Sequence, residues 1–208
     1  MNALAAKYDG WTLDDITAAM GPEGEFDWNS YIPTEGYIYN CTEEVDELRQ
    51  YLSLISKGEL TSDVISMDNA RQYLQSQLDK LLMECTNSQG MAEVDFGKFP
   101  LDGLSLESDL NYANLSECTG LTSAQLASIS SMLYSTLPSV EFEGAEVFNG
   151  YYSSVDFSNC TGITVEQFLT GNLCNLSNKM PAITFTGSED FSHLSLDSVD
   201  LSKCMRVE

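Results

Sequence analysis

The sequence predicts an α+β protein in which a small, acidic helical domain (residues 1–90) precedes a short α/β solenoid (residues 91–208). Three observations predict this fold class. Apolar residues recur at helical spacing through the first ninety residues. A ten-residue motif returns in the second half at a nearly constant period. The hydrophobic content of 43% is enough for a packed core despite a formal net charge of -23.

The first predicted helix is short and begins after Thr12. Asp14 and Asp15 follow this hydroxyl residue, and acids in a first helical turn are favoured by the helix dipole. Gly21 and the proline after it end the pattern. The aromatic and acidic segment 23–40 that follows is expected to form a loop or short strands.

Two longer amphipathic helices follow, and we expect them to pair as a helical hairpin. The first begins at Thr42, and the second runs from Ser66 to Glu84. Their predicted buried stripes are Val45, Leu48, Leu52 and Ile55 in the first, and Ala70, Tyr73, Leu74, Leu78, Leu81 and Leu82 in the second. Residues 86–90 have the composition of a linker.

The second half of the chain contains an internal repeat. The segment 113–122 reads ANLSECTGLT, returns at 155–164 as VDFSNCTGIT, and begins again at 199–204 as VDLSKC. The repeated cysteines are 42 and 44 residues apart. A second block, 137–144, returns in phase at 180–187. Periods of roughly 20 to 50 residues are typical of stacked solenoid units.

One repeat unit is predicted to contain strand, turn, helix and strand. Apolar residues alternate with an outward acid in 155–160, as in a short strand with one buried face. The segments 122–125 and 164–167 are capping boxes, so a short helix should follow each. In the first copy the apolar stripe of this helix is expected to reach Leu133.

The motif (Val/Ala)-(Asp/Asn)-(Leu/Phe)-Ser-x-Cys-Thr-Gly-(Ile/Leu)-Thr resembles the cysteine-containing leucine-rich repeat, and its core is similar to pentapeptide repeats. The resemblance covers residues 92–204 and about two and a half units. It implies stacked parallel strands. Ordinary leucine-rich repeats span roughly 20 to 29 residues, so this unit would be a double or enlarged one. No cap follows Cys204, which predicts an exposed last strand able to pair with a second copy.

The charge excludes some partners and favours others. The chain has 32 Asp and Glu against 9 Lys and Arg, with no basic residue between Lys98 and Lys179. Such a surface repels nucleic acid and anionic membranes and attracts basic grooves. Residues 1–15 have no apolar run behind a positive segment, so we expect no signal peptide, and no stretch approaches the roughly 18 apolar residues of a membrane span. The expected location is the cytoplasm of a bacterial or phage-infected cell.

Motifs for catalysis and metal binding are missing. The one histidine, His193, has no nucleophile, metalloprotease or phosphate-loop motif beside it. The acids at 23–27 alternate as in a calcium loop but lack its glycine and terminal glutamate. None of the six cysteines forms a C-x-x-C pair, so we expect reduced, buried thiols. The sequence therefore predicts a non-enzymatic protein without metal or cofactor.

Acidic clusters are the predicted partner-binding residues. Alternating acids on a strand lie about 7 Å apart, close to the phosphate spacing of a nucleic-acid strand. These residues are Asp14, Asp15, Glu23, Glu25, Asp27, Glu43, Glu44, Asp46, Glu47, Asp102, Glu107, Asp109, Glu141, Glu143 and Glu146.

The leading hypothesis is an inhibitor that mimics nucleic acid and occludes a basic nucleic-acid-binding groove. Topoisomerase-blocking pentapeptide-repeat proteins are one analogy. Small, acidic phage anti-CRISPR proteins are the other and preferred one, since RNA-guided nucleases bind DNA and read the PAM with arginines in a positive groove. The alternatives are a leucine-rich-repeat-type protein-binding module and a self-assembling structural protein. The sequence leaves the partner, the oligomeric state and the continuity of the acidic face open.

Overall fold

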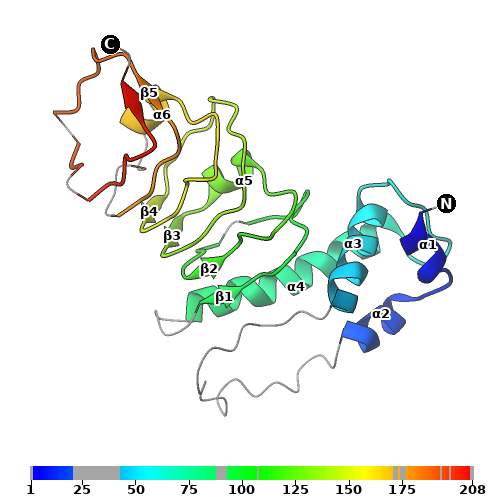
Figure 1. The fold of residues 1–208 in the computed structure, drawn as a ribbon. Helices are drawn as coiled ribbons and strands as arrows, with labels where there is room; N and C mark the ends of the chain where they lie inside the picture. The colour runs from blue at the N-terminus through cyan, green and yellow to red at the C-terminus, as the bar shows by residue number, and fades with distance from the viewer. Residues whose placement is uncertain are drawn as a thin grey trace.

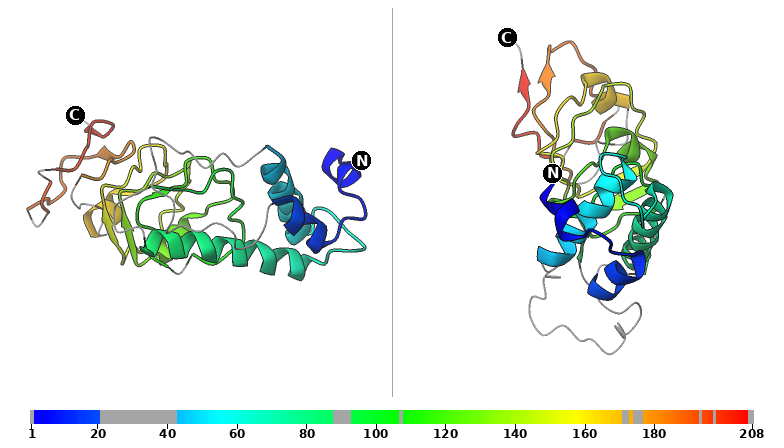
Figure 2. Two further views of the ribbon diagram at one scale, coloured as in Figure 1. Left: turned by 90° about the horizontal axis from the view of Figure 1, so that it is seen from below. Right: turned by 90° about the vertical axis from the view of Figure 1, so that its right-hand side faces the viewer.

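The computed structural model describes residues 2–20, 43–87, 93–106, 108–170, 173, 177–192, 194–196 and 198–206. Over these residues the protein combines helices with small parallel sheets. Helices α1 to α4 occupy one end, and the strands follow one another toward the C-terminus at the other (Figures 1 and 2). Within these ranges no helix has both the length and the apolar character needed to cross a membrane.

Four helices form the N-terminal end. They are α1 (Ala3–Lys7), α2 (Leu13–Met20), α3 (Glu43–Ser56) and α4 (Met67–Asn87). The last three confirm the predicted helices, with ends shifted by up to three residues. Helix α1 was not predicted because five residues are too few to show a periodic stripe. The Asn2 side chain caps it by accepting the backbone N–H of Leu4.

The predicted stripes of α3 and α4 face each other, and the two helices pack together. In α3, Leu48, Leu52 and Ile55 are buried, whereas Val45 is half-buried. The buried residues of α4 are Ala70, Leu74, Leu78, Leu82 and Cys85, and Tyr73 and Leu81 are half-buried against the same core. Burial of these side chains supplies the hydrophobic stabilisation of the helical end.

Short strands and two further helices make up the rest of the described chain. The strands are β1 (Val94–Asp95), β2 (Ala113–Asn114), β3 (Ser131–Leu133), β4 (Tyr151–Ser153), β5 (Thr184–Phe185) and β6 (Met205–Arg206). They pair in parallel as β1–β2, β3–β4 and β5–β6. The helices are α5 (Ser123–Ser128) and α6 (Val165–Thr170), and both follow the predicted capping boxes.

The prediction that the α5 stripe reaches Leu133 was wrong. Helix α5 ends at Ser128, and Leu133 belongs to strand β3. The Ile129 backbone is already extended, because the chain must turn there to pair with β4.

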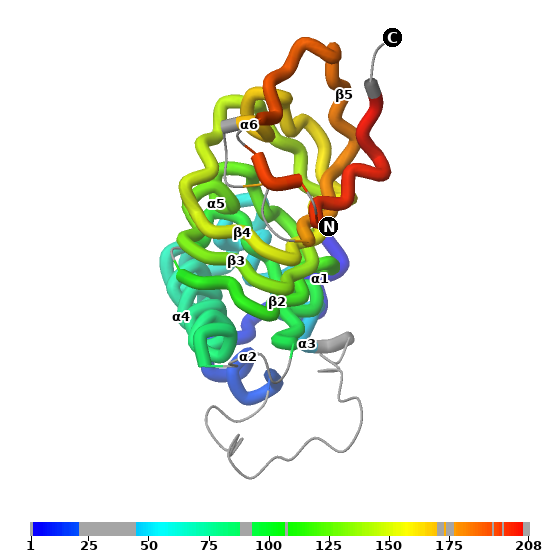
Figure 3. Tube along the Cα trace, turned by 90° about the vertical axis from the view of Figure 1, so that its left-hand side faces the viewer, coloured from blue at the N-terminus to red at the C-terminus, as the bar shows by residue number. Residues whose placement is uncertain are grey.

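Single-residue bridges join these strands into a longer parallel ladder. Its successive ladder residues, each paired with the next, are Asp95, Asn114, Thr136, Asp156, Lys179 and Asp200. They follow one another every 19 to 23 residues, half the sequence period. We call the short segment around each ladder residue a rung. Each sequence repeat therefore contributes two rungs. Figure 3 shows the chain segments of β2, β3 and β4 lying one above another.

The rungs fall into two classes, distinguished by the turn after the ladder residue. In the Asx rungs, Asp95, Asn114, Asp156 and Asp200 each accept the backbone N–H two residues later, at Gly97, Ser116, Ser158 and Ser202. In the proline rungs, Thr136 and Lys179 are followed two residues later by Pro138 and Pro181. Proline has no N–H, so this position needs no acceptor.

The residue before each ladder residue points inward. Ala113 and Val155 hold this position in two Asx rungs, and Ser135 and Asn178 hold it in the proline rungs. Ser135 Oγ accepts the Ala113 N–H at 3.1 Å, and Asn178 Oδ1 accepts the Val155 N–H at 2.9 Å. Each buried polar side chain thus satisfies a backbone donor of the preceding rung.

Candidate functional site

The structure tests the predicted acidic site only in part. Glu23, Glu25, Asp27 and Glu107 lie outside the described residues, as does His193. Glu43 and Glu44 lie in the first turn of α3, where only the backbone is described.

Two of the acids near the N-terminus bind groups of their own chain. Asp15 accepts the backbone N–H of Thr12 at 2.8 Å and its hydroxyl at 2.7 Å, and these hydrogen bonds lower the pKa of the carboxyl. Glu47 accepts hydrogen bonds from Lys7 and Tyr8, and the bond from Lys7 lowers the pKa of the glutamate. Both carboxylates stabilise the helical end.

Asp46 and Asp102 take part in ion pairs between the helical end and the first strand segment. Asp46 lies 3.7 Å from the Arg49 guanidinium and 3.9 Å from the Lys98 ammonium. Asp102 lies 2.8 Å from Lys57. The Asp46–Lys98 and Lys57–Asp102 pairs join α3 and the residue after it to residues 98–102, so they help to hold the two parts of the chain together.

The Glu146 carboxylate stabilises the turn at residues 143–146. Its two carboxylate oxygens accept the backbone N–H groups of Glu143 and Gly144 at 2.8 and 2.9 Å, and Gln167 Nε2 donates to it at 2.9 Å. Burial opposes ionisation of this group, but hydrogen bonds from Ser123, the backbone and Gln167 outweigh it and lower the pKa of Glu146 to about 2. The carboxylate is used within the fold.

The remaining predicted acids lie on three different segments. Asp14 is exposed on α2, Asp109 is half-buried before β2, and Glu141 and Glu143 are exposed between β3 and β4.

Sequence reasoning missed a column of side chains beside the ladder. Tyr112, Tyr134, Ser154 and Ser177 each lie two residues before a ladder residue, and all four have left-handed backbone with φ between 51° and 63°. Non-glycine residues rarely adopt this conformation. The rings of Tyr112 and Tyr134 stack at 5.1 Å with an interplanar angle of 10°. Tyr134 is nevertheless 57% exposed.

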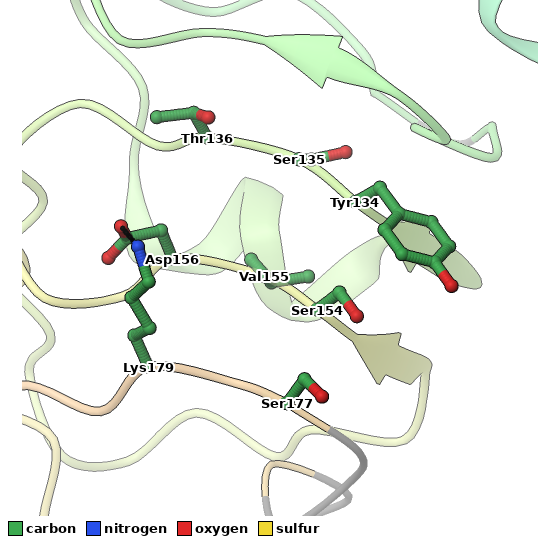
Figure 4. A pocket seen from close by; sticks show the side chains of 8 residues that line it. All are labelled: Tyr134, Ser135, Thr136, Ser154, Val155, Asp156, Ser177 and Lys179. Carbon is green, nitrogen blue, oxygen red and sulfur yellow. Dashed lines mark hydrogen bonds and ion pairs between the residues drawn. The ribbon is translucent and has the colours of Figure 1, made fainter. Parts of the chain in front are cut away.

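We call the surface formed by these side chains and the neighbouring ladder residues the ladder face. A shallow depression of about 230 Å³ lies on it. It is lined by Tyr134, Ser135, Thr136, Ser154, Val155, Asp156, Ser177 and Lys179. Figure 4 shows two columns, with Tyr134, Ser154 and Ser177 on one side and Thr136, Asp156 and Lys179 on the other. The middle residue of each rung points inward, and the small serines widen the resulting trough.

The charge of the ladder face differs from that of the whole chain. Lys179 is a ladder residue, and Lys98 and Lys203 each lie three residues after one. Lys179 Nζ lies 2.9 Å from Asp156 Oδ2. Burial opposes ionisation of Asp156, but hydrogen bonds from Ser158 and Lys179 outweigh it and lower the pKa of the carboxyl. The ladder face is thus polar and aromatic, with charges of both signs.

The described residues show no arrangement of three or more His, Cys, Asp or Glu side chains suited to a metal ion. The thiols of Cys85, Cys118 and Cys160 are buried, and burial raises the pKa of each, to about 12, 12 and 11 respectively. A protonated thiol is a poor nucleophile.

Comparison with known proteins gives no family assignment for the chain. No family model matches the chain, and no match is found among curated proteins or solved structures.

Proposed function

We propose that residues 93–206 form a solenoid-type protein-binding module that contacts its partner through the ladder face. The observation that carries this proposal is the exposed Tyr134, stacked on Tyr112 and bordering the depression. Tyrosine is enriched in protein interfaces and in their energetic hot spots, where its ring offers a large contact area with a polar tip.

The backbone beneath the ladder face supports this proposal. Hydrogen bonds between successive rungs, such as Thr136 N–H to Ala113 O and Lys179 N–H to Val155 O, fix the side chains about 4.8 Å apart. The four left-handed residues carry a conformational cost of about 1 to 2 kcal/mol each. Such strain is concentrated at functional sites. A prepositioned surface loses little entropy on binding.

Charge favours a second candidate function, the nucleic-acid mimic. The chain carries 32 acids against 9 bases. Five of those bases, Lys7, Arg49, Lys57, Lys98 and Lys179, already pair with carboxylates. The acids that remain would then attract the basic groove of a DNA-handling enzyme, such as an RNA-guided nuclease in a phage-infected cell.

Affinity capture with matched variants distinguishes the two functions. The bait proteins are the wild type, a Tyr112→Asn/Tyr134→Asn variant and a Glu141→Gln/Glu143→Gln variant, each used at about 50 and 500 mM salt. Asparagine tolerates left-handed backbone, so the tyrosine variant should keep the fold. We expect a partner that the wild type and the Glu141→Gln/Glu143→Gln variant capture alike and that the tyrosine variant loses.

The opposite pattern would support the mimic instead. A DNA-handling enzyme captured equally by the wild type and the tyrosine variant, released at 500 mM salt and displaced by DNA, would overturn the ladder-face proposal. Circular dichroism of each bait serves as the control for folding.

A further inference from the structure

We infer that the depression on the ladder face receives an arginine side chain from a basic partner protein. This inference rests on the proposed function, since it names the chemistry by which the ladder face would recognise its partner. Three features of the trough carry it: a carboxylate on one side, an aromatic ring at one end and hydroxyl groups along both sides.

Asp156 supplies the anionic group. It is the one carboxylate among the described residues that line the depression, and its lowered pKa keeps it ionised. Its side chain is 26% exposed, whereas that of its partner Lys179 is 57% exposed. An incoming guanidinium can therefore replace the more exposed ammonium of Lys179 at the carboxylate. Lys179 then stays near a second carboxylate, because Asp200 is the next ladder residue.

The shape of the trough suits arginine better than lysine. Thr136 and Asp156 are adjacent on the ladder, so a hydroxyl and a carboxylate lie side by side for the planar donors of a guanidinium. Lysine offers a compact charge that cannot bridge two such acceptors.

The aromatic end of the trough accommodates the rest of the side chain. An arginine stem that crosses from Asp156 toward the other column reaches the Tyr134 ring and the small Ser154. Tyr112 supports the Tyr134 ring from behind by stacking, so the ring need not move to make this contact. Arginine and tyrosine pair often at interface hot spots.

The overall charge favours the same partner. A net charge of -23 attracts cationic proteins over long distances and raises their association rate. The trough would then convert this unspecific attraction into recognition of one side chain.

The test is an NMR titration of the full chain with three blocked pentapeptides, Gly-Gly-X-Gly-Gly, in which X is arginine, lysine or citrulline. Citrulline keeps the planar shape without the charge. We expect amide shifts confined to residues 134–136, 154–156 and 177–179, with the arginine peptide bound several-fold more tightly than the lysine peptide and the citrulline peptide bound least.

Two variants and a control sharpen the result. Asp156→Asn keeps its turn, as Asn114 does in an equivalent rung, and should weaken arginine-peptide binding by about tenfold. Tyr134→Asn should weaken it by several-fold, and Glu143→Gln should leave it unchanged. Equal binding of the lysine peptide, shifts spread over the acidic surface, or an unaffected Asp156→Asn variant would each overturn the inference.

The capture experiment separates this inference from the proposed function. A partner lost in the Tyr112→Asn/Tyr134→Asn variant but fully retained by Asp156→Asn would leave the ladder-face function standing and overturn the arginine assignment. A partner unaffected by the tyrosine variant would overturn both.

Discussion

The two classes of rung occupy equivalent places on one ladder but meet the same backbone requirements with different residues. After the ladder residue, an Asx rung uses a side-chain oxygen to accept an N–H, as Asp156 does for Ser158. A proline rung removes that N–H with Pro138 or Pro181. One class adds an acceptor, and the other deletes a donor.

A second difference lies in the following turn. Two of the four Asx rungs, those of Asn114 and Asp156, use Gln125 and Gln167, whose oxygens accept the N–H of Thr122 and Thr164 while their amide groups donate to the preceding segment. The proline rungs use Glu146 and Glu189, whose two oxygens each accept a backbone N–H. Among the described residues, only these two Asx rungs lead into a helix, α5 or α6.

The third difference explains why the classes alternate from Asn114 to Asp200, after two successive Asx rungs at Asp95 and Asn114. The inward residue is apolar at Ala113 and Val155 and polar at Ser135 and Asn178. Each polar side chain accepts the N–H of the apolar residue one rung earlier. In this stretch each Asx rung and the proline rung after it are therefore complementary, and the sequence repeats after two rungs.

Loss of the polar inward residue should have the largest effect on stability. Asn178 is fully buried and also donates to the carbonyls of Tyr152 and Leu173. Asn178→Ala leaves these two carbonyls and the Val155 N–H unpaired, and we expect a loss of at least about 3 kcal/mol in the free energy of unfolding. Urea unfolding measures it.

Ser135→Ala is the matched variant for this comparison. Ser135 Oγ accepts the Ala113 N–H and donates to Leu110 O, so its loss leaves fewer polar groups without a hydrogen-bond partner than the loss of Asn178 does. We expect about half the effect of Asn178→Ala. A larger loss for Ser135→Ala than for Asn178→Ala would show that the two residues do not play equivalent parts.

Conversion of a proline rung into an Asx rung should have a smaller effect on the free energy of unfolding. Pro138→Ser adds an N–H at a buried position and should cost about 1 kcal/mol. Adding Thr136→Asp supplies the acceptor found in an Asx rung and should recover most of this loss. A double-mutant cycle by urea unfolding tests the pair, and additive effects would contradict the proposed role of the turn.

The carboxylate turns should make stability depend on pH. The pKa of Glu146 is lowered to about 2, so its contribution is complete above the unfolded-state pKa of about 4.3 and is lost as the pH falls toward 2. Glu146→Gln should destabilise the protein at pH 7, and the difference from wild type should shrink below pH 4.3. Urea midpoints between pH 7 and 2.5 measure it, and a constant difference would contradict this role.

The smallest effect concerns the thiols of the Asx rungs. Burial raises the pKa of Cys118 to about 12 and of Cys160 to about 11, whereas Cys204 is only half-buried. At pH 8 iodoacetamide should therefore modify Cys204 first, as measured by mass spectrometry of the digested protein. Addition of urea serves as the control that exposes all three. Faster modification of Cys160 in native protein would show that its rung opens.

Much of the fold follows from local sequence patterns. The stripes of α3 and α4 and the capping boxes before α5 and α6 were predicted because each depends on residues close together in the chain. The rung spacing was not resolved, because the proline rungs share only apolar positions with the Asx rungs. Whether an acid such as Glu146 binds groups of its own chain depends on which N–H groups the folded chain brings near it, and the sequence does not show this.

The candidate site was harder to predict. Tyr112 and Tyr134 are 22 residues apart, and neither position holds the glycine or asparagine that would have signalled a left-handed backbone. Their stacking arises only once the ladder sets successive rungs side by side. The charge, visible at once in the composition, said little about which face is shaped for binding.

The alternation of rungs also limits how a chain of this kind can grow or shrink. Between Asn114 and Asp200, insertion of a single rung would place two apolar inward residues, or two polar ones, in succession and would break the pairing of each polar side chain with the N–H one rung earlier. The smallest insertion or deletion that keeps this pairing is a pair of rungs, 43 residues when counted from Ser135 to Asn178. An engineered extension of this stretch should therefore copy the pair as one cassette.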